Sequence, residues 1–406
     1  MPTLVQKYGG TSVAGPERIR AVAHRVATAR RSGADTVVVV SAMGQTTDEL
    51  VRLAHEVSAQ PNRRELDMLL TTGERVSMAL LAMALHDLDV EAISFTGSQS
   101  GILTEGPHNA ARIMDIRPDR IRAELARGRV VIVAGFQGVD PATREITTLG
   151  RGGSDTTAVA LAAALAPAEC EIYTDVGGVL TADPRVVPEA RVIPRLGHTA
   201  CSTLAHLGGH VLHARCVDLA ARHRVPLTVR SSFDDQPGTR IVEDTDMEGP
   251  RIDAVTQRTQ CAIVIAEGTP GGRGEARGIL EAVADAFPEL ELIAHERQGE
   301  VHSTLVWLGS PADADALESD FRRLRGPGGE WKLSVERGAA FVSLVGLGLG
   351  AREAVRAEAT LEKAGVPVMA LRATPTALVF RVPEPRAADS VRALHAAFLE
   401  PVRASV

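Results

Sequence analysis

Short runs rich in valine and isoleucine alternate with amphipathic stretches over residues 1–244, and this alternation restricts the possible folds more than any other feature. The runs have the length and composition of strands, and apolar residues recur every three or four positions between them, as in helices. Strands that alternate with helices predict a mainly parallel sheet with helices on both faces, which binds ligands at the carboxyl ends of its strands. The predicted strands are 3–8, 36–43, 90–97, 129–138, 170–175 and 225–233.

A polar stretch at 234–253, with Pro-Gly and Gly-Pro dipeptides, predicts a domain boundary. Beyond it the order strand–helix–strand–strand–helix occurs twice, which indicates an internal repeat of about 70 to 80 residues of the split βαβ type. We therefore expect an α/β domain at 1–244, followed by two α+β, ferredoxin-like domains at 254–330 and 331–406.

The composition excludes several classes of protein. Apolar residues make up 45% of the 406 residues, which indicates a folded globular chain, and the net charge of −7 argues against a nucleic-acid-binding surface. The longest apolar run is too short to span a membrane, and the start lacks the core of a signal peptide. The four cysteines have no CxxC spacing, as expected in a reducing compartment. These features predict a cytoplasmic protein without a membrane partner.

Two predicted strands end in loops of small residues. In "QKYGGTSVAG" (6–15), Gly9 and Gly10 allow backbone N–H groups to approach an anion, and Lys7 could supply a positive charge. The segment is not a Walker A loop, and a purely structural turn explains it equally well. In "VVVVSAMGQTTDEL" (37–50), Ser41 and Thr47 could line a ligand site or belong to an ordinary helix cap.

Two further loops combine glycine with charge. In "TLGRGGSDTTA", capping of the following buried helix explains Ser154 and Asp155 but not Arg151, whose guanidinium is suited to a carboxylate. A dinucleotide-binding loop is disfavoured because Asp155 stands where its third glycine belongs. In "YTDVGGVLTADPRVVPEA", Arg185 could contact nucleotide phosphates.

Taken together, these motifs resemble those of the aspartate kinases, enzymes of the amino-acid kinase fold that carry paired ACT regulatory domains. The resemblance follows the same order and spacing to about residue 243, and the C-terminal repeat matches the ACT element order. The motifs are "KYGGTSVAG", "VVSAMGQTTDEL", "TTGERVS", "AGFQG", "TLGRGGSDTTA", "YTDVGGVLTADPRVVPEA", "VLHAR" and "VPLTVRSSF".

The resemblance implies transfer of the γ-phosphoryl group of ATP, with Mg²⁺, to the side-chain carboxylate of L-aspartate. It assigns phosphate stabilisation to Lys7 and backbone donation to the two glycines, and it makes Asp155 the catalytic aspartate that organises the reacting groups. Arg151 then binds the α-carboxylate and Glu74 the α-ammonium. The implied amino-acid pocket is Ser41, Thr47, Glu74, Arg151 and Ser154, and the implied nucleotide site is Lys7, Gly9, Gly10, Thr174, Asp175, Arg185 and His210.

One departure from the family pattern concerns the nucleotide. His210 stands where the family has a lysine, so a positive charge near the triphosphate is lost. His206, His210 and His213 could share a helix face and bind Zn²⁺, but two glycines interrupt that helix. We expect no protein-bound metal site there.

The second departure concerns regulation. The segment "AHERQGEVHSTLVW" stands where the family has an asparagine-containing segment, and "LRATPTALVF" stands where it has one rich in Ser, Thr and acidic residues. Polar groups matched to the ammonium and carboxylate of an amino-acid effector are not evident in either segment. We therefore expect feedback inhibition by lysine or threonine to be weak, absent or altered, and by resemblance we expect a homodimer formed through the ACT-like domains. Two alternatives remain open, namely a kinase for another small amino or carboxylic acid and a non-catalytic, ligand-sensing subunit.

Overall fold

The computed structural model describes residues 3–209, 211–244, 250–269, 274–287, 289–298, 302–326 and 328–400. The chain forms two compact units. The first comprises Met1–Thr181 and Glu189–Gly249, and the second comprises Ala182–Pro188 and Pro250–Val406.

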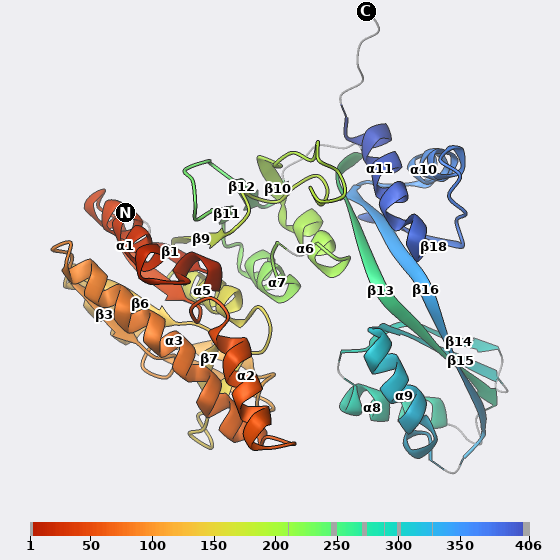
Figure 1. Ribbon diagram of the computed structural model, residues 1–406, viewed down its shortest axis with the longest axis horizontal. Coiled ribbons are helices and arrows are strands. Elements are labelled where there is room, and N and C mark those ends of the chain that lie inside the picture. Colours follow the sequence, from red (N-terminus) through yellow and green to blue (C-terminus); the bar gives the residue numbers. More distant parts are fainter. Residues whose placement is uncertain are drawn as a thin grey trace, which may run out of the picture. The chain divides into compact units, whose positions relative to one another are not determined.

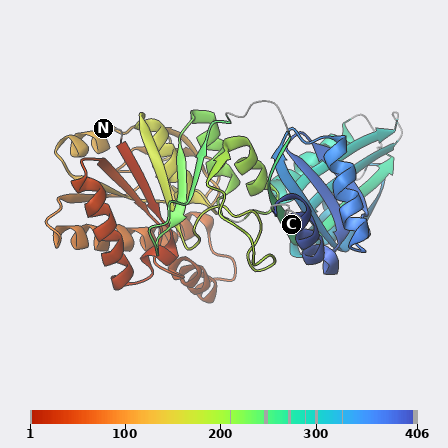
Figure 2. The ribbon, with the colours of Figure 1, turned by 90° about the horizontal axis from the view of Figure 1, so that it is seen from above.

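An eight-stranded sheet forms the centre of the first unit, in the order β10-β12-β11-β9-β1-β2-β6-β3 (Figures 1 and 2). Every neighbouring pair in it is parallel except β11 and β12. The mainly parallel α/β arrangement predicted from the alternating pattern is thereby confirmed. The strands are β1 (Thr3–Tyr8), β2 (Asp35–Val40), β3 (Ala92–Phe95), β6 (Val130–Ala134), β9 (Ala168–Thr174), β10 (Arg195–Gly197), β11 (Leu227–Ser231) and β12 (Thr239–Val242).

Helices cover both faces of this sheet. Successive side chains of β1 point to opposite faces, so they show which helices lie on which face. Tyr8 belongs to the core beneath α1 (Pro16–Arg31) and α3 (Arg63–His86). Its neighbour Lys7 points to the opposite face, where it meets α5 (Gly153–Ala164). The remaining helices of this unit are η1 (Gly10–Val13), α2 (Thr46–Val57), α4 (Asp119–Ala126), α6 (His198–His206) and α7 (Ala214–His223).

The strand predicted at 129–138 is in fact two strands in different sheets. β6 ends at Ala134, the chain turns through Phe136 at φ 71°, and β7 (Gln137–Val139) joins a second, four-stranded sheet. The prediction was wrong because the turn depends on a distant contact: a β-carbon at Gly135 would lie 2.8 Å from Oγ of Ser154. The other strands of that sheet are β4 (Ile102–Glu105), β5 (Arg112–Ile116) and β8 (Ile146–Thr148).

The second unit contains a six-stranded sheet in the order β14-β15-β13-β16-β18-β17. Along the chain, strand–helix–strand–strand–helix occurs twice, which confirms the predicted α+β class. The elements are β13 (Arg251–Thr269), α8 (Glu275–Ala286), β14 (Glu291–Gln298), β15 (His302–Gly309), α9 (Pro311–Leu324), β16 (Glu330–Leu347), α10 (Ala351–Lys363), β17 (Ala370–Thr374), β18 (Ala377–Pro383), η2 (Glu384–Arg386) and α11 (Ala387–Phe398).

The two long central strands run through both halves of this sheet. In β13, residues 251–258 pair with residues 341–347 of β16, and residues 261–269 pair with residues 330–339. The predicted limits 254–330 and 331–406 stay a prediction, because β13 and β16 each contribute to both repeats.

Candidate active site

The carboxyl ends of four parallel strands meet at one edge of the main sheet, in the order β9, β1, β2, β6. The chain passes from β1 to β2 on one side, whereas β9 lies on the other side of β1. The strand order therefore changes direction at β1, and open α/β sheets bind ligands at such a point. Several residues predicted for catalysis and binding lie at these strand ends or directly after them, namely Lys7, Gly9, Gly10, Ser41, Thr174 and Asp175.

Lys7 and Asp155 form a largely buried ion pair at this edge. Nζ of Lys7 lies 2.6 Å from Oδ1 of Asp155, and the two side chains are 11% and 14% exposed. The N-cap of α5 is Gly152, with φ 67° and no side-chain cap, so Ser154 and Asp155 lie inside the first turn. The expectation that these two residues cap the helix was wrong. Asp155 instead holds the lysine charge beside the end of β1.

The two glycines after β1 are held closely by their surroundings. A β-carbon at Gly9 would lie 3.3 Å from Nζ of Lys7, and one at Gly10 would lie 3.0 Å from the carbonyl oxygen of Gly44. The loop after β2 therefore packs on the loop after β1, and the hydrogen bond from the N–H of Gly44 to the carbonyl of Gly10 joins them at 3.0 Å. Because Gly9 and Gly10 have no side chains, the backbone beside Lys7 can approach an anion closely.

Glu74 brings an incompletely paired carboxylate to the same edge. It lies on α3, is 3% exposed, and its Oε1 accepts a hydrogen bond from the N–H of Ala42 at 3.2 Å. Its buried Oε2 has no hydrogen-bond partner in the described part of the chain. Gly73 lets α3 approach, because a β-carbon there would lie 2.7 Å from Cβ of Ala42. Ser41 precedes Ala42, and Thr47 lies in the first turn of α2.

Burial raises the pKa of Glu74 to about 7, because it disfavours the charged carboxylate more than two backbone hydrogen bonds favour it. A bound ammonium group needs the ionised form. We therefore predict that the KM for an amino-acid substrate rises as the pH falls from about 8 to about 6, and that Glu74→Gln abolishes this dependence and raises KM at the higher pH. Initial rates across this range check it, with exposed Glu17→Gln as control. An unchanged pH profile in Glu74→Gln would contradict the prediction.

The same group makes stability depend on pH in a known direction. The pKa of Glu74 in the folded state, about 7, lies above its ordinary value of 4.5, so protonation of Glu74 favours the folded state. This contribution to the free energy of unfolding is complete below the ordinary pKa and is lost as the pH rises through the folded-state pKa. Glu74→Gln should therefore unfold at a higher temperature than the unmodified protein at about pH 8.

Arg151 occupies the tight turn between β8 and α5. Gly150 and Gly152, on either side of it, have φ values of 74° and 67°, in the left-handed region. The side chain of Arg151 is exposed and makes no hydrogen bond or ion pair to the residues that the structure describes. Ser154 is buried against Gly135 at the end of β6. The guanidinium thus remains available to a ligand while the backbone around it is constrained.

The predicted nucleotide residues belong to different units of the chain. Thr174 is the last residue of β9 and Asp175 follows it, and Oγ1 of Thr174 donates to Oδ1 of Asp175 at 3.1 Å. Arg185 lies in the segment Ala182–Pro188 of the second unit and pairs with Asp183 at 2.7 Å. His210 lies outside the described residues, and so does the zinc alternative that depends on it.

Sequence reasoning missed a second carboxylate on the same face of α3. Asp67 is completely buried two turns before Glu74 and accepts hydrogen bonds from Thr148, the last residue of the strand that precedes the Arg151 turn. The spacing of seven residues was visible in the sequence, but nothing there distinguished this acid from a solvent-exposed one.

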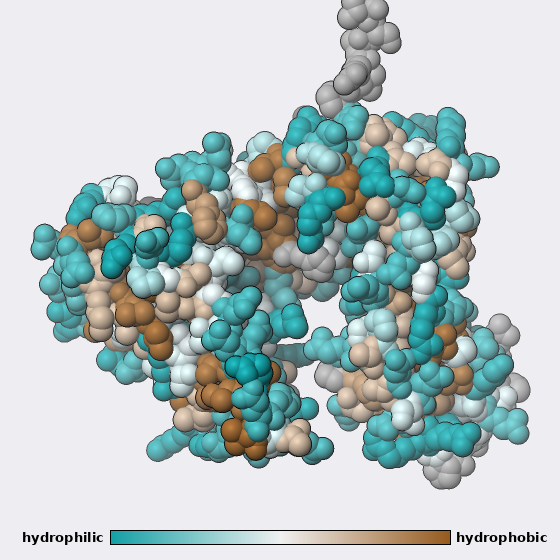
Figure 3. Space-filling view, in the orientation of Figure 1, coloured by the Kyte–Doolittle hydropathy of each residue, from teal (hydrophilic) through white to brown (hydrophobic). Residues whose placement is uncertain are grey.

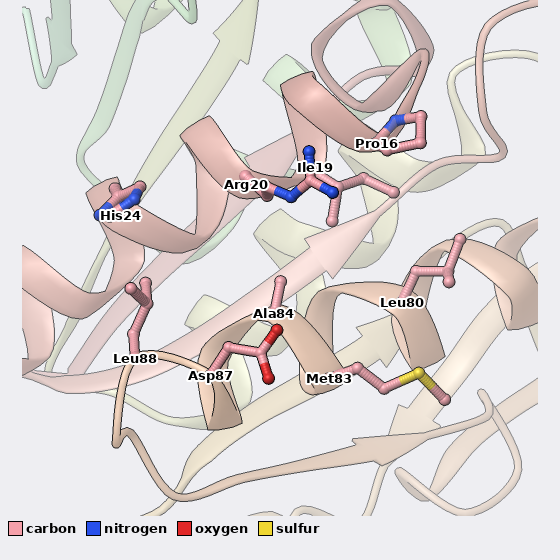
Figure 4. A pocket seen from close by; sticks show the side chains of 9 residues that line it. All are labelled: Pro16, Ile19, Arg20, His24, Leu80, Met83, Ala84, Asp87 and Leu88. Atoms are coloured by element: carbon pink, nitrogen blue, oxygen red, sulfur yellow. The ribbon is translucent and has the colours of Figure 1, made fainter.

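A separate hollow of about 250 Å³ lies between α1 and α3, lined by residues that include Arg20, Met83 and Asp87 (Figure 4). None of its lining residues is among those predicted for catalysis or binding. On the face shown in Figure 3, apolar side chains gather over α2 and α3. Among the described residues, α3 alone has the length and apolar character of a membrane span, and its buried positions belong to the core.

Comparisons with known proteins agree with this architecture. The model of the amino acid kinase family matches residues 2–231. The aspartokinase of Mycobacterium tuberculosis is 46% identical over 88% of this chain and 86% of its own, and that of Mycolicibacterium smegmatis is 42% identical over 98% and 96%. The crystal structure of aspartokinase III from E. coli, in complex with aspartate and ADP, superposes with a TM-score of 0.80 at 25% identity, covering 98% of this chain and 100% of that one. The chain therefore belongs to the amino acid kinase family and, within it, to the aspartokinases.

Proposed function

We propose that this protein transfers the γ-phosphoryl group of ATP to the side-chain carboxylate of L-aspartate, which gives L-aspartyl 4-phosphate and ADP. A carboxylate oxygen forms the new P–O bond as the bond to the β-phosphate oxygen breaks and ADP leaves. The observation that carries the proposal is the ion pair between Lys7 and Asp155 at the switch point of the sheet. The likeness to aspartokinases over most of the chain supports it.

On the amino-acid side, we assign complementary charges to the two ends of the substrate. Arg151 binds the α-carboxylate, since a guanidinium forms two parallel hydrogen bonds with a carboxylate. Glu74 binds the α-ammonium through the oxygen that lacks a described partner. We assign Ser41, Thr47 and Ser154 to the pocket around the reacting carboxylate, and this assignment is a proposal from the family motif.

On the nucleotide side, phosphoryl transfer depends mainly on positioning and on neutralising charge. Lys7 supplies the charge, held in place by Asp155. We assign Gly9 and Gly10 as backbone donors to the phosphates from the family motif; in the structure the N–H of Gly9 donates to the carbonyl of Tyr173 at 3.3 Å. From the family motif we also assign Thr174, Asp175, Arg185 and His210 to nucleotide binding, and this assignment is a proposal.

The residues at these strand ends fit a magnesium ion that arrives with ATP. The described residues contain no group of three or more His, Cys, Asp or Glu side chains that could hold a metal ion. Nucleotide phosphates and water usually provide most Mg²⁺ ligands, together with one or two carboxylates, and Asp175 is exposed at the end of β9. When bound, Mg²⁺ neutralises charge on the β- and γ-phosphates.

Trapping the acyl phosphate with hydroxylamine tests the function directly. The purified protein is given Mg-ATP, hydroxylamine and, one at a time, L-aspartate, D-aspartate, L-glutamate, L-asparagine and succinate. We expect the hydroxamate of L-aspartate alone. A different hydroxamate would identify a kinase for another acid, and no product with any acid would support the ligand-sensing alternative.

We further propose that the protein works in the cytoplasm as a homodimer formed through its ACT-like domains, with weak feedback control. The four cysteines are all free and buried, which suits a reducing compartment. We predict that millimolar lysine or threonine, singly or together, lowers the rate by less than about twofold, because both effector segments depart from the family pattern that matches the two charges of an amino acid. Inhibition by added ADP serves as the positive control, and a micromolar inhibition constant for either amino acid would disprove weak control.

A further inference from the structure

Helix α3 carries two buried carboxylates on one face, and they differ in how many of their oxygens have hydrogen-bond partners. Glu74 keeps one oxygen without a described partner. Asp67, which is completely buried, is saturated: its Oδ1 accepts from the hydroxyl of Thr148 at 2.6 Å, and its Oδ2 accepts from the N–H of Thr148 at 3.0 Å and of Asn109 at 3.2 Å. Nδ1 of His108 lies 2.7 Å from the same Oδ2.

The partners of Asp67 lead directly to the Arg151 turn. Thr148 is the last residue of β8, and the turn begins at the next residue. The segment 108–111 lies against the turn, because the carbonyl of Thr148 accepts from the N–H of Ala111 at 3.0 Å. A β-carbon at Gly150 would lie 2.9 Å from the carbonyl oxygen of Asn109. Asp67 therefore fixes both backbone segments next to the turn.

Helix α7 also holds the two backbone segments beside the turn. The guanidinium of Arg215 donates to the carbonyls of Leu149 and Ala111, each at 2.8 Å. A β-carbon at Gly152 would lie 2.4 Å from Cβ of His213, so the other end of the turn is packed as well. Only the side chain of Arg151 projects from this support without a partner among the described residues.

We propose that Asp67 is a positioning residue for aspartate binding, which fixes the separation between Arg151 and Glu74. The two charges of an α-amino acid are a set distance apart, and one rigid helix carries both Glu74 and the anchor of the Arg151 turn. Without the hydrogen bonds of Asp67, the turn with its two left-handed glycines can adopt several conformations. Substrate binding must then order the turn, and the lost conformational entropy makes the binding free energy less favourable. This inference rests on the proposed roles of Arg151 and Glu74.

Replacing Asp67 by asparagine tests the inference, because the amide keeps the volume but cannot accept hydrogen bonds at its nitrogen. We expect the KM for aspartate to rise about 10-fold and the KM for ATP to change by less than about twofold, because the described hydrogen-bond partners of Asp67 are His108, Asn109 and Thr148 and not residues of β1 or its loop. Amide hydrogen exchange at 149–152 should become faster than in the unmodified protein, and saturating aspartate should slow it.

The matched control is Glu124→Gln, which alters another buried acid on α4, paired with Arg127 and Arg129. It should lower the melting temperature without changing either KM. Thr148→Val, which removes only the hydroxyl donor, should raise the KM for aspartate about 3-fold and serves if Asp67→Asn does not fold. An equal rise in both KM values, or an unchanged KM for aspartate in folded Asp67→Asn and Thr148→Val, would overturn the inference. If the unmodified protein itself makes no aspartyl hydroxamate, the proposed function fails instead.

Discussion

Replacing Lys7 by alanine is expected to lower kcat by about 10³-fold, the largest effect of any single substitution predicted for this protein. The ammonium group is nearly buried and stands at the end of β1, where the sheet changes direction. Charge that develops during phosphoryl transfer is stabilised most strongly by such a preorganised cation in a site with little water. Formation of aspartyl hydroxamate at saturating aspartate and ATP measures the loss.

The partner of Lys7 provides a sharper measurement of the same effect. If Asp155 acts mainly by holding the lysine, Asp155→Asn in the Lys7→Ala background should cost much less than in the unmodified protein, because residues that act as a unit are not additive. Lys363→Ala, an exposed lysine on α10 of the second unit, is the control and should leave kcat unchanged. A Lys7→Ala variant that is folded and keeps more than about a tenth of kcat would contradict the assignment.

The second large effect is expected for Arg151→Ala, which should raise the KM for aspartate about 100-fold while the KM for ATP stays within about twofold. The arginine is exposed and makes no contact that maintains the fold among the described residues, so its removal should leave the melting temperature nearly unchanged. Arg151→Lys should recover only part of the affinity, since an ammonium cannot donate two parallel hydrogen bonds to a carboxylate. Initial rates against aspartate concentration measure both.

A control for Arg151→Ala replaces another exposed arginine of the first unit. It separates the effect of losing a positive charge from the effect of losing the guanidinium at position 151. Arg222→Ala, on the exposed side of α7, removes the same net charge and should change neither KM. A KM for ATP that rises with the KM for aspartate in Arg151→Ala would place the guanidinium on the nucleotide instead.

Local sequence patterns were sufficient for the order of elements and for most of the loops that carry the site. Strand composition and helical periodicity depend on a few neighbouring residues, so they indicate β1, β2 and β9 without knowledge of the fold. The break at Phe136 was missed because the contacts around it come from far along the chain, where Ser154 packs against Gly135, which has no side chain.

The sequence alone thus determined the alternating architecture, the family resemblance and the types of residue that line the site, because each of these depends on local composition and spacing. Only the tertiary structure decided which charges are already paired and which remain available to a ligand. Lys7 of β1 meets Asp155 of α5, and Asp67 is saturated while Glu74, two turns away on the same helix, keeps an oxygen without a described partner. Burial and pairing arise from segments that are distant in the chain, and these long-range contacts distinguish the roles that we propose for three otherwise similar acids, as a catalytic partner, an anchor and a substrate ligand.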